Sequence, residues 1–158
     1  MSTISQTWHF GYKAHIGVDE KSGLVHTVKA TPANEHDVTI MSELLHGEEE
    51  RAYGDSGYIG ANKRPEAINK NGKKIKYLIN RRSSSIKKLS KSGQYAAKKK
   101  EHQKSSVRCK VEHVFAVIKN IFQYRKTRYR GLRKQTAKLN IMFALANLYL
   151  AARKSLTV

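Results

Sequence analysis

The chain has 158 residues, a single cysteine and a formal net charge of +19. This length suits one compact domain with its own core, and the lone Cys109 excludes a disulfide framework and a CxxC metal site. The longest apolar run, residues 141–152, is too short to cross a bilayer, and we expect no signal peptide. The charge favours a polyanionic partner, of which nucleic acid is the commonest, over a merely soluble basic surface.

The charge is divided unevenly along the chain. Residues 1–60 hold four Lys or Arg and nine Asp or Glu, whereas residues 61–158 hold 27 basic and three acidic residues. The last 57 residues contain one acidic residue, Glu112. This asymmetry is typical of a fold whose later elements face an anion.

The first half of the sequence predicts a β-hairpin followed by short helices and strands. Residues 8–18 alternate in polarity, which indicates a strand, and residues 24–30 form the returning strand after a turn. Asn34 is a candidate N-cap for a helix at residues 38–47 that ends at Gly47. The remaining elements are a strand with a glycine-rich turn at residues 51–60, a helix at 62–70 and a strand at 74–79.

The second half predicts two long helices after a basic loop. Residues 81–105 are rich in Ser and Lys and lack apolar periodicity, so we expect a mobile loop with at most one helical turn. A helix beginning near Ser105 or Ser106 would carry an apolar stripe of Val107, Val111, Val114, Phe115, Ile118, Ile121 and Phe122. A last helix would turn Ile141, Leu145 and Leu148 inward. Together these elements predict a mixed α/β domain.

Two carboxylates stand in settings that need an explanation. Glu112 lies on the flank of the predicted stripe, in line with Arg108 and Lys119, and by itself reads best as a solvated i−4 partner of Arg108. Asp55 follows a short strand in a glycine-rich turn, where an Asx-turn or a helix N-cap would account for it. A strand-end carboxylate and a second one on a later helix are also the oxygen ligands that a Mg²⁺ site for phosphodiester chemistry uses.

Several motifs, in order, resemble the catalytic half of the DDE-type bacterial insertion-sequence transposases, most closely the insertion-sequence-5 family. They are GYKAHIGVDEKSGLVHTVKATPANEHD, YGDSGYIG, and RCKVEHVFAVIK followed by YRGL and ALANL, and they cover nearly all of residues 8–150. The resemblance implies an RNase H-like α/β fold, with a mixed sheet and flanking helices. It also implies a triad of two Asp and one Glu that binds Mg²⁺ or Mn²⁺ to cleave DNA and transfer its strands.

The resemblance assigns roles to individual residues. Asp55 matches the second Asp of the triad and Glu112 the final Glu, both as catalytic metal ligands. Arg108 and Lys119 match the basic signature around that Glu, whose members meet DNA phosphates, while Ser105 stands where the signature has Tyr. Further DNA contacts are expected from residues 81–105 and from a basic cluster of Arg125, Lys126, Arg128 and Arg130. Tyr124 and Tyr129, interleaved with this cluster, are candidates for stacking, with at least one expected in the core.

The first Asp of the triad has no match. The family carries it on a strand before the GYKAH motif, and no acidic residue precedes Trp8. Asp19 in a hairpin turn and Asp37 in the first turn of a helix have sufficient structural explanations. We therefore expect residues 1–158 to form a single, N-terminally truncated RNase H-like domain that binds metal weakly and is inactive by itself. A decayed or shortened gene, or the second frame of a frameshifted gene, would give this pattern.

Three functions fit the sequence. The ordered motifs favour a transposase fragment that acts on DNA. A non-catalytic, basic nucleic-acid-binding protein would instead depend on the basic cluster and not on Asp55 or Glu112. A fragment that associates with a full-length transposase or an upstream-frame product would need a protein partner, and homo-oligomerisation stays open. We expect no membrane partner and a cytoplasmic, nucleoid-associated location in a bacterium, with which one unpaired cysteine is consistent.

Overall fold

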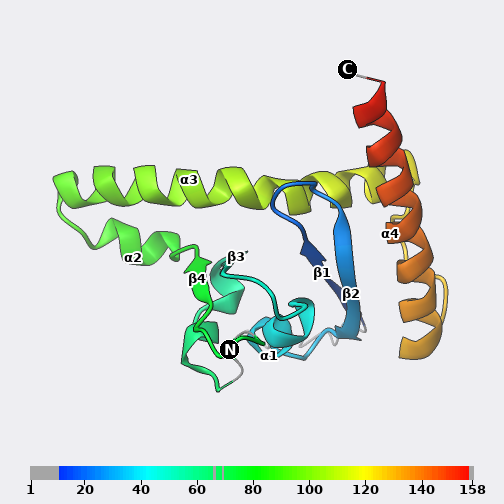
Figure 1. The fold of residues 1–158 in the computed structure, drawn as a ribbon, viewed down its shortest axis with the longest axis horizontal. Helices are drawn as coiled ribbons and strands as arrows, with labels where there is room; N and C mark the ends of the chain where they lie inside the picture. The colour runs from blue at the N-terminus through cyan, green and yellow to red at the C-terminus, as the bar shows by residue number, and fades with distance from the viewer. Residues whose placement is uncertain (1–10, 66, 69, 157–158) are drawn as a thin grey trace, which may run out of the picture.

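The computed structural model describes residues 11–65, 67–68 and 70–156. Within these residues the fold is mixed α/β, as predicted, with four strands arranged as two separate pairs. A long helix, α3 (Lys91–Ala116), runs past both pairs, and a second long helix, α4 (Leu132–Ser155), lies beside the first pair (Figure 1).

The first strand pair is an antiparallel hairpin of β1 (Tyr12–Val18) and β2 (Val25–Pro32). The turn between them is closed by the Asp19 carboxylate, which accepts hydrogen bonds from the backbone N–H groups of Lys21 and Ser22. Ile16 is buried, and Ala14 and Val18 on the same face pack against the same core, as the alternation predicts. Residues 8–10 of the predicted strand lie outside the described residues.

Between the two strand pairs the chain makes only short helical turns. Helix α1 (Asp37–Ile40) continues into the 3₁₀ turn η1 (Met41–Leu44), so the predicted helix at 38–47 is shorter than expected. The prediction of Asn34 as its N-cap was wrong, because the capping position is His36. The helix does not extend to Gly47 either: the 3₁₀ turn ends at Leu44, and the backbone of Leu45 is extended.

The second pair consists of β3 (Arg51–Gly54) and β4 (Lys76–Ile79), which run parallel. The connection between them contains the 3₁₀ turns η2 (Ser56–Tyr58) and η3 (Ala61–Lys63). The helix predicted at residues 62–70 is absent from the described part of that segment. Arg64 is extended, the conformation that a residue before a proline prefers, and this ends the helical turn before Pro65.

The basic stretch at residues 81–105 is helical, so the prediction of a mobile loop was wrong. It forms α2 (Ser83–Lys87) and the first half of α3 (Lys91–Ala116), which runs on into the π-helical turn η4 (Val117–Ile121). The Ser90 hydroxyl caps α3 by accepting from the Gly93 N–H. Alanine, lysine, glutamine and glutamate favour helix without an apolar stripe, which is why the periodicity did not reveal this half.

The last helix, α4 (Leu132–Ser155), buries a different face from the predicted one. Ile141, Leu145 and Leu148 are exposed, and the residues turned inward are Leu139, Met142, Phe143, Ala146 and Leu150. The helix carries apolar side chains all round, so its own pattern does not decide which face meets the hairpin. In the predicted stripe of α3, Val114 and Ile118 are buried, but Ile121 is exposed.

Two apolar cores hold these elements together. The first lies between the hairpin, the end of α3 and α4, and Phe143 meets Phe115 edge to face at its centre. The second is smaller and surrounds the parallel pair, with Met41, Ala52, Ala61 and Ile75 buried. The candidate site draws on both, because Glu112 belongs to α3 and Asp55 follows β3.

Candidate active site

Asp55 lies where β3 ends and η2 begins. Its extended backbone makes it the N-cap of η2, and its Oδ1 accepts a hydrogen bond of 2.8 Å from the Gly57 N–H. This confirms the cap that the sequence suggested for it. The side chain is about half exposed, at 49%, so the other oxygen, Oδ2, remains open to a cationic partner.

Glu112 projects from the last turns of α3. Its Oε1 accepts from the Nη2 of Arg108 at 2.8 Å, which confirms the i−4 pair expected from spacing. The Glu112 side chain is 63% exposed, so the ion pair by itself adds little to stability. The small stabilisation of the fold by this ion pair therefore does not explain well why a strongly basic segment contains a carboxylate at this position.

Arg108 brings the two carboxylates into one site. While its Nη2 holds Glu112, its Nη1 lies 3.9 Å from Oδ2 of Asp55. One guanidinium thus spans two acidic groups that are 57 positions apart in the sequence. The third nitrogen, Nε, is buried and has no hydrogen-bond partner among the described residues. The sequence predicted all three residues, and the fold places them together.

A second carboxylate, that of Asp37, lies beside Asp55. From the sequence, Asp37 was predicted only as a first-turn residue of a helix. A Cβ atom at Gly57 would come within 2.8 Å of Oδ2 of Asp37 and 3.0 Å of Oδ1 of Asp55. Glycine is required at this position because the two carboxylates close on it from either side. Asp37 does occupy the first turn of α1, as predicted, and also forms an ion pair of 3.0 Å with Lys13. No local signal in the sequence links Asp37 to Asp55.

Burial and the carboxylates of Asp37 and Asp55 affect the ionisation of a neighbouring tyrosine, Tyr58. Burial, followed by the negative charges of Asp37 and Asp55, raises the pKa of Tyr58 to about 12. Its hydroxyl lies 3.3 Å from Nδ1 of His15, whose Nε2 is 2.9 Å from the Thr31 hydroxyl. Tyr58 therefore stays a neutral hydrogen-bonding group that connects the hairpin to the Asp55 turn.

The predicted DNA-contacting residues that follow α3 are all exposed. Lys119 lies in η4, exposed, with its Nζ 5.9 Å from the centroid of the Phe115 ring. Arg125, Lys126, Arg128 and Arg130 are all exposed in the irregular segment between η4 and α4. Of the two interleaved tyrosines, Tyr124 packs against the first core and accepts a hydrogen bond from Gln135, whereas Tyr129 is half exposed. The expectation that at least one would pack in the core is confirmed.

Residues 81–105, which were predicted as a loop, add a basic surface on α3. Lys98, Lys99 and Lys100 are exposed on the first half of α3, which is helical and not an irregular loop. Lys104, by contrast, already has partners within the fold and is less available to DNA. Its Nζ donates to the carbonyl of Ile79 and pairs with Glu101, so it attaches α3 to the end of β4.

Comparison with protein families identifies the domain. A family model described as a transposase DDE domain matches residues 3–148, and the chain belongs to this family. DNA is the partner that such a domain implies. No solved structure matches the chain. Among the described residues, no helix is long and apolar enough to cross a membrane.

Proposed function

We propose that this DDE transposase domain acts in metal-dependent DNA cleavage and strand transfer during the transposition of an insertion sequence of the insertion-sequence-5 type. Asp55 and Glu112 are the proposed catalytic metal ligands. The observation that carries the proposal is that the single Arg108 guanidinium reaches both carboxylates, from β3 and from α3. An RNase H-like sheet is proposed with it, because the antiparallel and the parallel pair would each form one side of such a sheet.

The donor set suits Mg²⁺ or Mn²⁺. Both side chains offer carboxylate oxygens, the ligands that these hard cations prefer, and they are 49% and 63% exposed, so ions can reach them. When bound, the ions would activate the attacking oxygen and stabilise the leaving oxygen of a phosphodiester. The Gly57 N–H holds Oδ1 of Asp55 in place and leaves Oδ2 for the ligand role.

Arg108 would exchange partners during function. Its single positive charge now offsets part of the negative charge of the two carboxylates, which limits their mutual repulsion before a metal binds. A cation between the carboxylates would displace the guanidinium, and a DNA phosphate is a suitable new partner for its planar fork. Lys119 and the cluster of Arg125, Lys126, Arg128 and Arg130 would hold the flanking phosphates.

We further propose that the purified chain is inactive by itself. The resemblance assigns three carboxylates to the metals, and the sequence matches two of them, Asp55 and Glu112. Two acidic ligands supply less charge and an incomplete coordination shell, so metal affinity falls. Full activity would then require a partner chain, either a full-length transposase or an upstream-frame product, on DNA in the bacterial nucleoid.

Metal binding and DNA binding together test the site. Asp55→Asn and Glu112→Gln should each weaken Mn²⁺ binding at least about tenfold, whereas Asp19→Asn, a matched change in the hairpin turn, should leave it unchanged. Arg108→Gln should strengthen Mn²⁺ binding, because a competing cation is removed, and weaken DNA binding. Equal Mn²⁺ affinity in all four variants, with DNA binding lost only when the basic cluster is neutralised, would favour the non-catalytic nucleic-acid-binding protein.

A cleavage assay tests the inactivity separately. Supercoiled DNA with Mn²⁺ should stay intact in the presence of the purified chain. Cleavage that Asp55→Asn abolishes would refute the inactivity and support the site, whereas cleavage that survives Asp55→Asn would argue against the site itself.

A further inference from the structure

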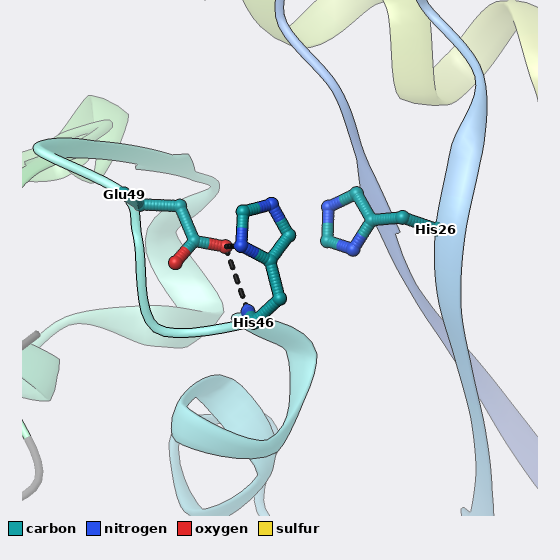
Figure 2. Close-up of side chains that lie close together, drawn as sticks. All are labelled: His26, His46 and Glu49. Carbon is teal, nitrogen blue, oxygen red and sulfur yellow. Dashed lines mark hydrogen bonds and ion pairs between the residues drawn. The ribbon is translucent and has the colours of Figure 1, made fainter. Parts of the chain in front are cut away.

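A second group of metal-ligating side chains lies away from the Asp55 turn. His26 on β2, His46 after η1 and Glu49 in the loop leading to β3 each offer one ligand atom, and these atoms lie within 4.8 Å of one another. Figure 2 shows the His26 ring facing the His46 ring, with Glu49 on the far side of His46. The two ring centroids are 4.9 Å apart, and Nδ1 of His46 lies 3.5 Å from Oε1 of Glu49.

The hairpin is irregular at the point where it supplies His26. Gly17 pairs with Thr27 and Val18 with Val25, so His26 is the additional residue of a β-bulge. A bulge redirects a side chain that a regular ladder would align with its neighbours. A Cβ at Gly17 would come within 3.0 Å of Nε2 and 2.6 Å of Cε1 of His26, so glycine leaves the space that the redirected ring occupies.

Each ligand is also oriented by its surroundings. Nδ1 of His26 lies 2.9 Å from the Thr27 hydroxyl, and when it donates there the lone pair is left on Nε2. Glu49 accepts from the backbone N–H of His46 with Oε1 and from that of Gly47 with Oε2, both at 2.8 Å. Hydrogen bonds of this kind fix the direction of metal ligands and tune their basicity.

The three side chains also form a donor set that suits a metal. Two imidazoles and one carboxylate form a donor set typical of Zn²⁺, whereas Mg²⁺ prefers oxygen ligands alone.

We propose that His26, His46 and Glu49 form a Zn²⁺ site, with the fourth position open to water, that links the hairpin to the segment leading into β3. Ligand atoms around tetrahedral zinc are about 3.3 Å apart, given bonds of about 2.0–2.1 Å. The present separations therefore require a small inward movement, which the half-exposed His46 ring is free to make. Bound zinc would thus connect the hairpin of the first core to the loop before β3, the strand that Asp55 follows.

Binding of Co²⁺ and Zn²⁺ to the full, untagged chain tests the site. Cys109→Ser serves as the background, because Cys109 is exposed and thiolates bind both ions. Co²⁺ should give the intense visible bands of tetrahedral coordination, Zn²⁺ should displace it, and Zn²⁺ should raise the melting temperature. His26→Ala and His46→Ala should each weaken binding at least about tenfold, whereas His102→Ala, which removes an exposed histidine of α3, should not.

Two outcomes would overturn the proposal: no Zn²⁺ binding below millimolar concentration, or equal binding by the His26→Ala variant. Glu49→Gln also removes one of the two loop hydrogen bonds, because glutamine has a single acceptor oxygen, so the exposed His26 is the decisive position. Asp55→Asn should leave Co²⁺ binding intact, because the two sites share no ligand. Failure of this site is thereby distinguished from failure of the proposed catalytic site.

Discussion

The two apolar cores of this domain differ in size and in how they meet the long helix. The first core joins the hairpin to α4 and the second half of α3 through large apolar side chains, including Phe143 and Val114, which are essentially inaccessible to solvent. Among the residues that the structure describes, the second core has four buried residues in its cluster, and it lies around β3 and β4. Burial of apolar area is the main favourable term in folding, so the first core should be the more stable one.

The second core is attached to α3 mainly by polar contacts. Glu101 accepts from the Arg81 N–H and pairs with Lys104, which donates to the Ile79 carbonyl, and Asn80 donates to the Ser105 hydroxyl. Glu112 therefore lies on the half of α3 that packs in the first core, whereas Asp55 lies beside the second. These contacts, made by Asn80, Arg81, Glu101, Lys104 and Ser105, form a polar junction between α3 and the second core. The distance between Asp55 and Glu112 depends on this junction, which is easier to adjust than a packed core.

The largest effect is expected in the first core. Phe143→Ala should lower the free energy of unfolding by about 3–5 kcal/mol, because it removes a fully buried ring and leaves a cavity against Phe115. Leu148→Ala on the exposed face of the same helix should change it by less than about 0.5 kcal/mol. Urea denaturation followed by circular dichroism measures both. Similar losses in the two variants would mean that the exposed face of α4 is covered in solution.

The second core should give a smaller and more local effect. Ile75→Ala removes a buried side chain and should cost about 2–3 kcal/mol, at the lower end for such a change, because few neighbours surround it. In native-state hydrogen exchange the amides of β3 and β4 should lose protection, while those of β1 and β2 keep theirs. A uniform loss across both strand pairs would show that the cores unfold as a single unit.

The next smaller loss of stability is expected at the polar junction. Glu101→Gln weakens the contacts to Arg81 and Lys104 and should cost about 1–2 kcal/mol, because the carboxylate is mostly buried. Glu48→Gln, an exposed position, is the matched control. The same exchange experiment should show faster exchange in the first half of α3 and an unchanged second half. An equal change in both halves would contradict a separable junction.

The smallest effect concerns pH. Burial lowers the pKa of His15 below its ordinary value of 6.5, and it outweighs Asp37 and Glu35, which raise the pKa, while Lys13 adds to the lowering. The folded state therefore binds fewer protons than the unfolded state, and stability falls as the pH drops through about 6.5. His15→Gln should flatten the dependence of the unfolding free energy on pH between about pH 7 and 5, with part of it remaining from His26.

Asp19→Asn is the control for this measurement. The hydrogen bonds from Ser22 lower the pKa of Asp19, so this carboxyl titrates below the chosen window and its removal should not alter the slope. An unchanged slope in the His15→Gln variant would place the pH dependence elsewhere, with His26 as the first residue to test.

Local features were predictable because their causes lie within a few residues. Alternation gave the hairpin, the glycine-rich turn gave the cap at Asp55, and i−4 spacing gave the Arg108–Glu112 pair. The first half of α3 was missed because it buries little besides Ala97, so no apolar period marks it. The buried face of α4 was mispredicted because apolar residues occur all round that helix.

The charge, the hairpin, the local setting of each carboxylate and, through ordered motifs, the transposase family could all be inferred from the sequence. Which distant groups meet is visible only in the folded domain: Arg108 with Asp55, Asp37 with Gly57, and His26 with His46 and Glu49. Backbone and neighbour preferences act over a few residues, whereas a binding site is created by packing, which brings together segments that carry no sign of one another in the sequence.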